Sequence, residues 1–138
     1  MTTDTNDFNR KIIAEFRENA GKVGGMFAGM PMLLLHTTGA KSGAERINPL
    51  AFRPEGAGWV VFASKGGAPS NPDWYHNLLA HSDVSIEVGA ETVKVRARFA
   101  AGAEHDRIWA AQKQAVPQFA EYETKTKRKI PVVVLERR

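Results

Sequence analysis

The chain has 138 residues, of which 43% are hydrophobic and 25% are charged. This balance is typical of one globular domain that buries its own core. Because the sequence has no cysteine, disulfides, zinc–thiolate sites and a thiol nucleophile are excluded. The net charge of +4 favours an anionic partner. This leaves open nucleic acid, an anionic membrane surface and a phosphorylated or polycarboxylate small molecule.

The N-terminal residues are polar and do not match a signal peptide. No apolar run reaches the roughly 18 residues of a spanning helix. We therefore expect a cytoplasmic protein in which residues 1–138 form a single domain and residues 1–30 supply an N-terminal helix and a connector. A peripheral membrane contact through this N-terminal segment is compatible with its apolar residues.

Apolar periodicity predicts the elements in chain order. Six strands are predicted, over 32–37, 46–53, 59–64, 84–88, 92–99 and 131–135. Three helices are predicted, over 5–19, 73–80 and 104–116, with a turn or short helix over 119–124. Because the strands are joined mainly by tight turns, we expect an antiparallel sheet or small barrel with peripheral helices.

Some details of this pattern concern single residues. In the helix over 73–80, Trp74, Leu78 and Leu79 are expected on or near the buried side, and Ser70 or Asn71 is expected to cap the helix. In the strand over 92–99, the basic residues at positions 94, 96 and 98 alternate with apolar ones and are expected to face solvent. The basic run over 125–129 is interpreted as a solvated turn.

A tight polar turn separates the first two predicted strands. Lys41, Ser42 and Arg46 crowd around it, and nearby glycines permit close approach and positive φ. Consecutive backbone NH groups in such a turn can form a cradle for an anion. The alternative interpretation is an ordinary solvated hairpin turn.

A second glycine-bearing loop leaves the strand predicted over 59–64, and it again places a serine, Ser64, beside a lysine, Lys65. Together the two loops could clamp a phosphate and nearby carboxylates through charge-assisted hydrogen bonds. Trp74 and Tyr75 follow the second loop and could form a wall of the same pocket. Since no acid, base or metal is built in, the pattern suits an enzyme whose cofactor supplies the chemistry.

Other chemistries are not supported by the sequence. Ala40 stands where a phosphate-binding ATPase loop requires glycine, and no Gly-x-Gly-x-x-Gly follows a strand. The four histidines do not have metal-binding spacing, so no metal is predicted. Ser42 and Ser64 have no adjacent base that the sequence identifies. The aromatic residues do not interleave with basic ones as base stacking requires, so nucleic acid is not a predicted partner.

Five motifs follow one another in a fixed order: Leu35–Gly43, Arg46–Leu50, Ala63–Gly67, Asn71–Leu78 and Ile130–Val134. Over roughly residues 30–136, this combination resembles the deazaflavin-dependent nitroreductase and quinone reductase family of actinobacteria. The resemblance implies an α+β fold with an antiparallel split β-barrel, like that of FMN-binding flavin reductases and pyridoxamine oxidases. It also implies that the cofactor is coenzyme F420, an 8-hydroxy-5-deazaflavin.

The resemblance further implies a set of cofactor-binding residues. These are Lys41, Ser42, Arg46, Ile47, Asn48, Pro49, Phe62, Ala63, Ser64, Lys65, Asp73, Trp74, Tyr75, His76 and Asn77. Of these, Lys41, Ser42 and Arg46 are implied to bind the phosphodiester and the oligoglutamate tail. Residues 62–65 are implied to lie along the deazaflavin ring and its linker, and the helix that begins at Asp73 to close the ring side of the site. Reduced coenzyme would donate a hydride from C5 to a quinone, a conjugated enone or a nitro compound.

The matching substrate pocket holds Ala51, Val116, Phe119 and Tyr122. Relatives that reduce nitroimidazole prodrugs carry more tyrosines there, so efficient prodrug reduction is not expected of this chain. No catalytic residue is assigned, and Ser64 and Tyr122 are candidates for positioning substrate or coenzyme. Two alternatives remain: an FMN-binding split-barrel oxidoreductase, and a non-catalytic module that binds the deazaflavin or another anion. A monomer and a homodimer are both compatible with the sequence.

Overall fold

A computed structural model describes residues 3–24, 31–64 and 70–138 of the chain. These ranges contain seven strands: β1 (Met32–Thr38), β2 (Glu45–Ala51), β3 (Arg53–Glu55), β4 (Gly58–Phe62), β5 (Asp83–Val88), β6 (Glu91–Phe99) and β7 (Val132–Arg137). They also contain four helices: α1 (Thr3–Glu18), α2 (Asp73–Ala80), α3 (Gly102–Ala115) and α4 (Gln118–Lys125).

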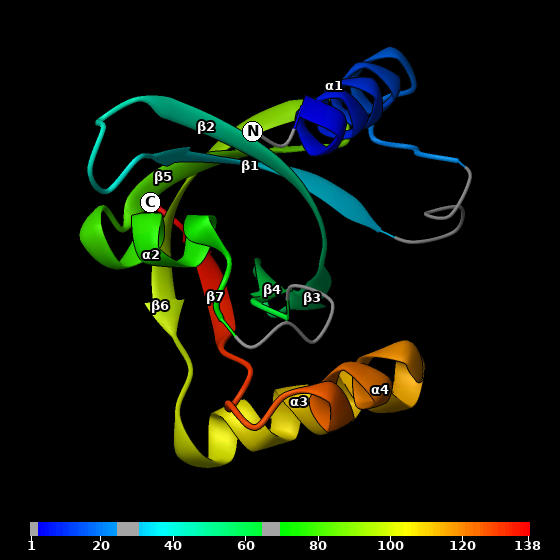
Figure 1. The fold of residues 1–138 in the computed structure, drawn as a ribbon, viewed down its shortest axis with the longest axis vertical. Coiled ribbons are helices and arrows are strands. Elements are labelled where there is room, and N and C mark those ends of the chain that lie inside the picture. Colours follow the sequence, from blue (N-terminus) through cyan, green and yellow to red (C-terminus); the bar gives the residue numbers. More distant parts are fainter. Residues whose placement is uncertain (1–2, 25–30, 65–69) are drawn as a thin grey trace.

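The seven strands form one antiparallel sheet in the order β2-β1-β5-β6-β7-β4-β3. Its two edge strands, β2 and β3, are separated in the sequence by a single residue, Phe52. Two successive Cα steps cover at most about 7 Å. The sheet therefore has to curl until its two edges meet near Phe52. Figure 1 shows this curl, in which β2 leads directly into β3.

The concave side of the curled sheet holds the main hydrophobic core. Val93, Val95 and Ala97 of β6 are buried there, whereas the basic residues at positions 94, 96 and 98 are exposed, as the alternation predicts. Trp74 and Leu78 of α2 pack into the same core. Burial of these two residues attaches α2 to the sheet and fixes the position of its other side chains.

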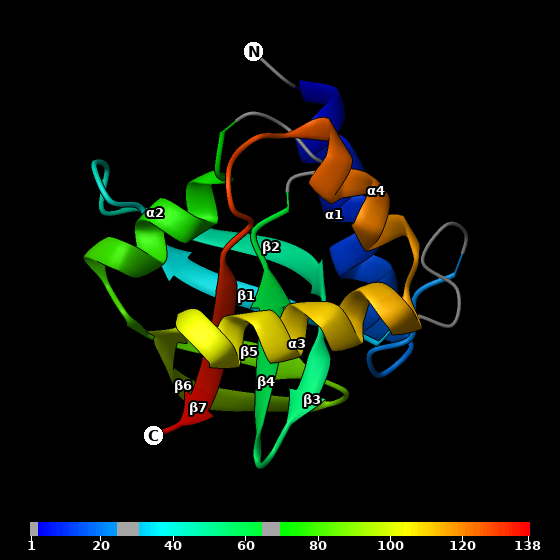
Figure 2. The ribbon, with the colours of Figure 1, turned by 90° about the horizontal axis from the view of Figure 1, so that it is seen from below.

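β4 and β7 are buried on both faces because α3 covers their outer side, with α4 following it (Figure 2). The outer cluster consists of Val60, Phe62, Ile108, Trp109, Phe119, Ile130, Val132 and Val134. Burial on two faces explains why both strands are continuous apolar runs instead of alternating ones. The helix predicted over 104–116 corresponds to α3, and the short helix expected over 119–124 corresponds to α4.

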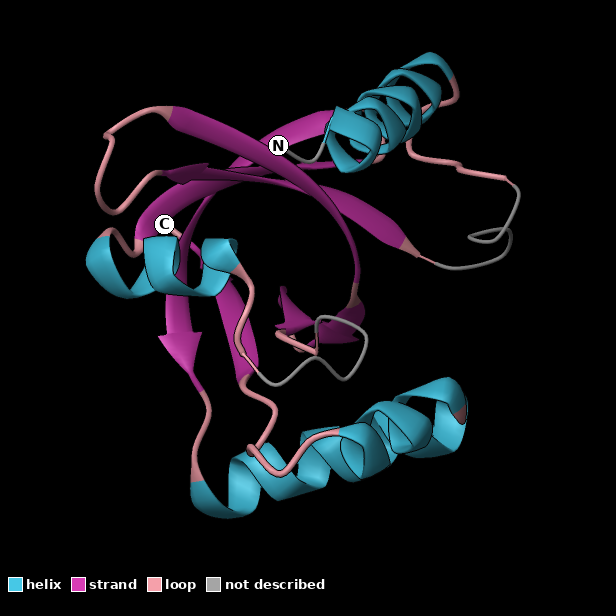
Figure 3. Cartoon of the chain, in the orientation of Figure 1, coloured by secondary structure: helices cyan, strands magenta, loops and turns pink. Residues whose placement is uncertain are grey.

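α1 packs on the outer face of β1 and β2 (Figure 3). Ile12 and Phe16 contribute to a third cluster with Met32 and Leu34, so the apolar face of this helix is buried on the sheet. Arg17 Nε and Nη2 donate to the two carboxylate oxygens of Glu87, at 3.1 and 2.7 Å. Among the described residues, no helix combines the length and apolarity needed to cross a membrane.

Two predicted boundaries differ from the structure. The strand predicted over 46–53 is broken at Phe52, whose NH donates to the carbonyl of Pro31 at 3.1 Å while the chain crosses from one sheet edge to the other. The break produces a seventh strand. The turn expected over 54–58 is also tighter, since Glu55 already pairs with Gly58 in the β3–β4 hairpin.

Two details predicted for α2 were wrong. The cap expected at Ser70 or Asn71 is not formed, because Pro72 occupies the N-cap position. Leu79 is 52% exposed instead of buried. The helix is only eight residues long, and Trp74 and Leu78 form its buried apolar face. Leu79 therefore lies beside this face, toward solvent.

Candidate cofactor site

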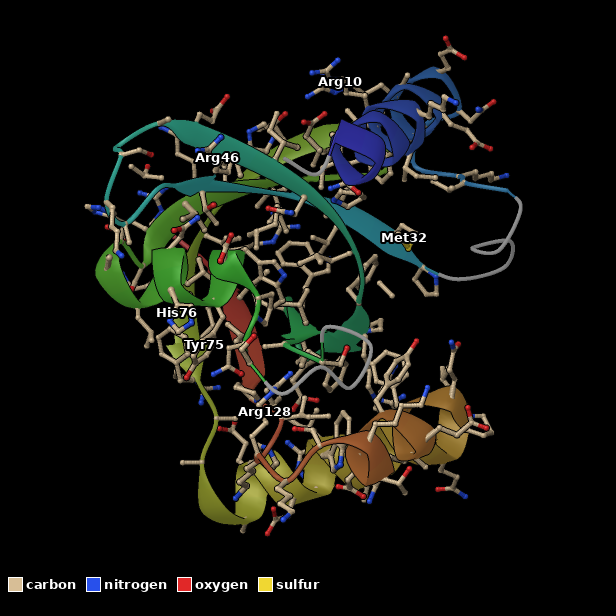
Figure 4. The ribbon with its side chains drawn as sticks, in the orientation of Figure 1. Arg10, Met32, Arg46, Tyr75, His76 and Arg128 are labelled. Atoms are coloured by element: carbon tan, nitrogen blue, oxygen red, sulfur yellow. The ribbon has the colours of Figure 1, made fainter. Side chains whose placement is uncertain are left out.

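A cavity of about 1080 Å³ lies between the β1–β2 hairpin, α2 and α1. Its lining residues are Asn9, Arg10, Ile13, Gly39, Ala40, Lys41, Ser42, Glu45, Arg46, Ile47, Asn48, Asp73, Trp74, His76 and Asn77. Nine of the predicted cofactor-binding residues are in this set. The structure thus brings the hairpin turn and the helix after the second loop to one site, as the resemblance implies (Figure 4).

Several backbone NH groups of the hairpin turn are bonded within the chain. Gly39 N donates to Ala44 O at 2.8 Å, and Gly43 N donates to Gly39 O at 2.9 Å. Ala44 N donates to Ser42 Oγ at 3.2 Å, and the turn closes so tightly that a Cβ on Gly39 would lie 2.4 Å from that oxygen. These bonds do not involve the NH groups of Lys41 and Ser42, so a cradle for an anion at this turn stays a prediction; the turn also presents exposed cationic side chains to the cavity.

Asn77 fastens this turn to α2. Its side chain is buried, its Oδ1 accepts from Ala40 N at 3.0 Å, and its Nδ2 donates to Thr37 Oγ1 at 3.1 Å. Both ends of the amide therefore have partners inside the chain. Asn77 was predicted to bind the cofactor, and the structure places it at the cavity wall as the link that positions Ala40 and the adjoining Lys41.

The charged groups of the cavity come from three elements. Lys41 and Arg46 come from the hairpin, and Arg10 comes from α1. Figure 4 labels Arg46 and Arg10. Glu45 and Asp73 line the same cavity, so three cations face two carboxylates. The site therefore carries a net positive charge, which favours an anionic ligand.

A protein-family model, the F420H(2)-dependent quinone reductases, matches residues 8–137 of this sequence. The chain belongs to this family. It is therefore an oxidoreductase, and coenzyme F420 is its hydride donor, as the sequence motifs predict. The family match begins at Phe8 and so includes most of α1, which the motifs quoted for the resemblance did not reach.

Individual relatives support the assignment. The F420H(2)-dependent quinone reductase Rv1261c of Mycobacterium tuberculosis is 40% identical over 91% of this chain and 87% of its own length. A solved F420-H2 dependent reductase, FDR-A, is 42% identical with a TM-score of 0.70, and covers 77% of this chain and 94% of its own. A Listeria innocua protein assigned to the pyridoxamine 5′-phosphate oxidases shares only the fold, with 10% identity, a TM-score of 0.55 and coverage of 94% and 93%. The predicted α+β split barrel is confirmed.

Five of the predicted cofactor-binding residues that the structure describes are not among the residues lining the cavity. Phe62 points into the outer cluster with Trp109, at 5.7 Å between ring centroids, and Tyr75 packs edge-on against Phe99 at 5.7 Å. Ala63 is fully buried. Pro49 and Ser64 lie outside the lining set, and Lys65 lies outside the described residues. Their roles in this reductase remain predictions.

The four residues of the expected substrate pocket fall into two places. Val116, Phe119 and Tyr122 lie together at the α3–α4 side, where the Phe119 and Tyr122 rings are 5.3 Å apart. Ala51 packs instead in the cluster beneath α1. Burial raises the pKa of the Tyr122 hydroxyl above its ordinary value, so this hydroxyl stays protonated and can act as a hydrogen-bond donor near neutral pH.

Two features of the site were not predicted from the sequence. The first is the wall of the cavity that α1 forms with Asn9, Arg10 and Ile13, here called the α1 wall. The sequence pattern of this segment indicated only a helix with one apolar face. The second is Arg128, which was interpreted as part of a solvated turn but is half-buried and donates to the carbonyl of Ala63, directly after β4. Within the described ranges, no group of three or more metal-ligating side chains is present.

Proposed function

We propose that this reductase binds F420H2 in the cavity between the hairpin turn and α2 and transfers its hydride to a quinone. The observation that supports this most directly is the joint placement of Lys41, Arg46 and Trp74 around one space of about 1080 Å³. Two cations suit the acidic part of the coenzyme, and a buried indole provides a flat apolar wall for its ring system.

The charges of the residues that line the cavity fit the coenzyme. A phosphodiester and an oligoglutamate tail need several cations along one groove, and Arg10, Lys41 and Arg46 supply them. Glu45 and Asp73 add negative charge at the same cavity, so a neutral or cationic portion of a ligand is placed best beside them. When bound, the coenzyme supplies the hydride; the chain supplies binding, orientation and exclusion of water.

For the acceptor, we propose that the protonated Tyr122 hydroxyl donates to a quinone oxygen. Val116 and Phe119 pack beside it and have no polar side-chain atoms, so Tyr122 would be the side-chain donor of that trio; the Gln118 side chain also hydrogen-bonds with Tyr122. A quinone or an enone needs one donor at a single developing oxyanion. A nitro group is served less well, and we expect slow reduction of nitroimidazole prodrugs.

Fluorescence titration of the purified protein with F420 and separately with FMN tests the proposal. We expect tight binding of F420, weak or no binding of FMN, and F420H2-dependent reduction of a quinone such as menadione. Tight FMN binding without affinity for F420 would overturn it in favour of a flavin oxidoreductase. Binding of F420 without turnover of any quinone or enone would indicate a carrier module.

Lys65→Ala tests whether the second loop belongs to the same site. If Lys65 contacts the coenzyme, we expect a loss of about 1–3 kcal/mol of binding free energy, the range for a charge-assisted contact. The dissociation constant for F420 measures it. Because the side chain of Lys94 is exposed on β6, Lys94→Ala removes the same charge elsewhere and serves as the control. An unchanged dissociation constant for Lys65→Ala would remove this residue from the site.

We also propose that the reductase forms a homodimer. A solved domain-swapped dimer that is 37% identical, with a TM-score of 0.72, covers 99% of this chain and 100% of its own. Light scattering coupled to size exclusion gives the mass directly, and a mass near 15.2 kDa would contradict the proposal. A membrane contact by α1 would require residues other than Ile12 and Phe16, which are buried. The cytoplasmic location stays a prediction.

A further inference from the structure

The end of β4 leaves two backbone carbonyls beyond the sheet ladder. β4 pairs with β7 as far as Phe62 opposite Val132, and Ala63 N still donates to Pro131 O at 3.0 Å. The pairing of β4 with β7 ends there, so the carbonyls of Ala63 and Ser64 lie outside the ladder. Ala63 is fully buried, and a buried carbonyl needs a donor from elsewhere in the chain.

Arg128 supplies these donors from the connection between α4 and β7. Its Nη1 donates to Ala63 O at 3.0 Å, and its Nη2 donates to Ser64 O at 2.8 Å. Nη1 also donates to Asn71 Oδ1 at 2.7 Å. One guanidinium therefore contacts residues on both sides of the connection between β4 and α2.

The contact set depends on the shape of the arginine side chain. Three acceptors lie within 3.0 Å of two neighbouring nitrogens, an arrangement that a planar fork can serve and a single ammonium cannot. Burial lowers the pKa of Arg128 from its ordinary value, yet an arginine remains charged in proteins. Partial burial of a charge is unfavourable by itself. The three hydrogen bonds of the Arg128 guanidinium compensate for this cost.

We propose that Arg128 is a positioning residue of the cofactor site, which holds Ser64 at a fixed distance from the start of α2. This inference rests on the proposed function. Asn71 directly precedes Pro72, the N-cap of α2, and Trp74 and Asn77 of that helix line the cavity. Because Arg128 itself is not among the lining residues, it acts through the two chain segments that it joins.

The experiment compares Arg128→Ala and Arg128→Lys with Arg96→Ala, which removes an exposed arginine of β6 that pairs with Asp83 of β5. We expect F420 to bind about tenfold more weakly to Arg128→Ala, and Arg128→Lys to recover little of this because it lacks the fork. Added guanidinium ion at millimolar concentration is expected to restore part of the affinity of Arg128→Ala and to leave Arg128→Lys unchanged. Folded Arg128→Ala that binds F420 within about twofold of wild type would overturn the proposal.

A second pair of variants covers the case in which Arg128→Ala does not fold. Asn71→Ala removes one of the three acceptors, whereas Asn71→Asp keeps an acceptor oxygen for the guanidinium. We expect a loss of affinity of about threefold for Asn71→Ala and a smaller loss for Asn71→Asp. Equal affinities for both variants and the wild type would contradict the role of this contact.

Hydrogen–deuterium exchange separates this inference from the proposed function. Faster exchange in peptides covering 60–64 and 70–75 is expected in folded Arg128→Ala without any coenzyme. If wild type binds no F420 but this exchange difference is present, the proposed function fails while the fastening role of Arg128 stands. If exchange is the same in both proteins, the positioning role is overturned whatever the wild type binds.

Discussion

The two segments that the sequence marked as similar, each with a serine beside a lysine, are held in different ways. The hairpin turn is closed by its own backbone, through the contacts of Gly39 N with Ala44 O and of Gly43 N with Gly39 O. The segment after β4 is held by Arg128, which donates to Ser64 O and lies 64 residues after it in the sequence. Local closure is visible in a sequence, and long-range closure is not.

This difference divides the cationic side chains into two kinds. Lys41 and Arg46 are exposed at the cavity, so their charges remain available to a ligand. Arg128 is half-buried, and its guanidinium is committed to three acceptors of the chain. Charge alone therefore does not identify a binding residue in this reductase: the first two are expected to contribute affinity, and the third to contribute geometry.

The largest effect is expected from removing both cations of the hairpin. For Lys41→Ala combined with Arg46→Ala, we expect F420 affinity to fall by about 3 kcal/mol, or roughly 100-fold, because two charge-assisted contacts are lost. The remaining binding should also depend less on salt concentration. Isothermal titration at two ionic strengths measures both quantities.

The matched control is the double variant Lys94→Ala with Arg96→Ala. It removes the same two charges from the exposed face of β6, which lies outside the lining of the cavity. We expect it to bind F420 nearly as wild type does. A similar loss in the two double variants would mean that net charge, and not the hairpin, attracts the coenzyme.

Asn77→Ala is expected to have the next largest effect, and on stability more than on affinity. It removes a buried acceptor for Ala40 N and a buried donor to Thr37 Oγ1, which lowers the free energy of unfolding by about 2 kcal/mol. Urea unfolding measures this change, with His76→Ala on the exposed side of the same helix as the control. Because the turn keeps its two local backbone bonds, F420 affinity should fall less than in Arg128→Ala. The reverse order would show that the turn is not closed by its own residues.

The sequence predicted the fold well where neighbouring residues determine the structure. The alternation of Val93, Val95 and Ala97 with basic residues indicated a half-buried strand, and β6 confirms it. Nothing local distinguishes Phe52, where β2 ends and β3 begins, because the break follows from the closure of the whole sheet. The exposure of Leu79 likewise depends on how α2 sits on the core.

The site shows the same division. The motifs around Lys41 and Asp73 were assigned to one pocket by family resemblance, and the cavity contains both. The α1 wall was missed because Arg10 and Ile13 follow an ordinary amphipathic pattern, which indicates a packed face but not what lies beside it. Arg128 was missed because its basic neighbours favour a solvated interpretation, and its three acceptors lie far away in the sequence.

The smallest predicted effect is the loss of stability at acidic pH. It is expected for the ion pairs of Glu87 and not for the hydrogen bonds of Arg128. His36 Nε2 on β1 donates to Glu87 Oε2 at 2.6 Å, and Arg17 of α1 donates to the same carboxylate. The hydrogen bond from Arg17 is the largest cause that lowers the pKa of Glu87 from its ordinary value of 4.5. Arg128, in contrast, stays charged, and its acceptors are carbonyl and amide oxygens, which do not titrate in this range.

A carboxyl group with a lowered folded-state pKa stabilises the fold above its unfolded-state pKa, and this contribution is lost as the pH falls through the folded-state value. We therefore expect wild type to exceed Glu87→Gln in the free energy of unfolding by less than about 1 kcal/mol at neutral pH, since Arg17 is half-exposed. The difference should shrink between about pH 5 and pH 3. Urea unfolding across that range measures it, and the protection of the amides of residues 60–64, taken relative to their intrinsic exchange rate at each pH, should not follow the same pH dependence. A constant difference between wild type and Glu87→Gln at all these pH values would show that the ionised carboxylate does not hold α1 and β1 together.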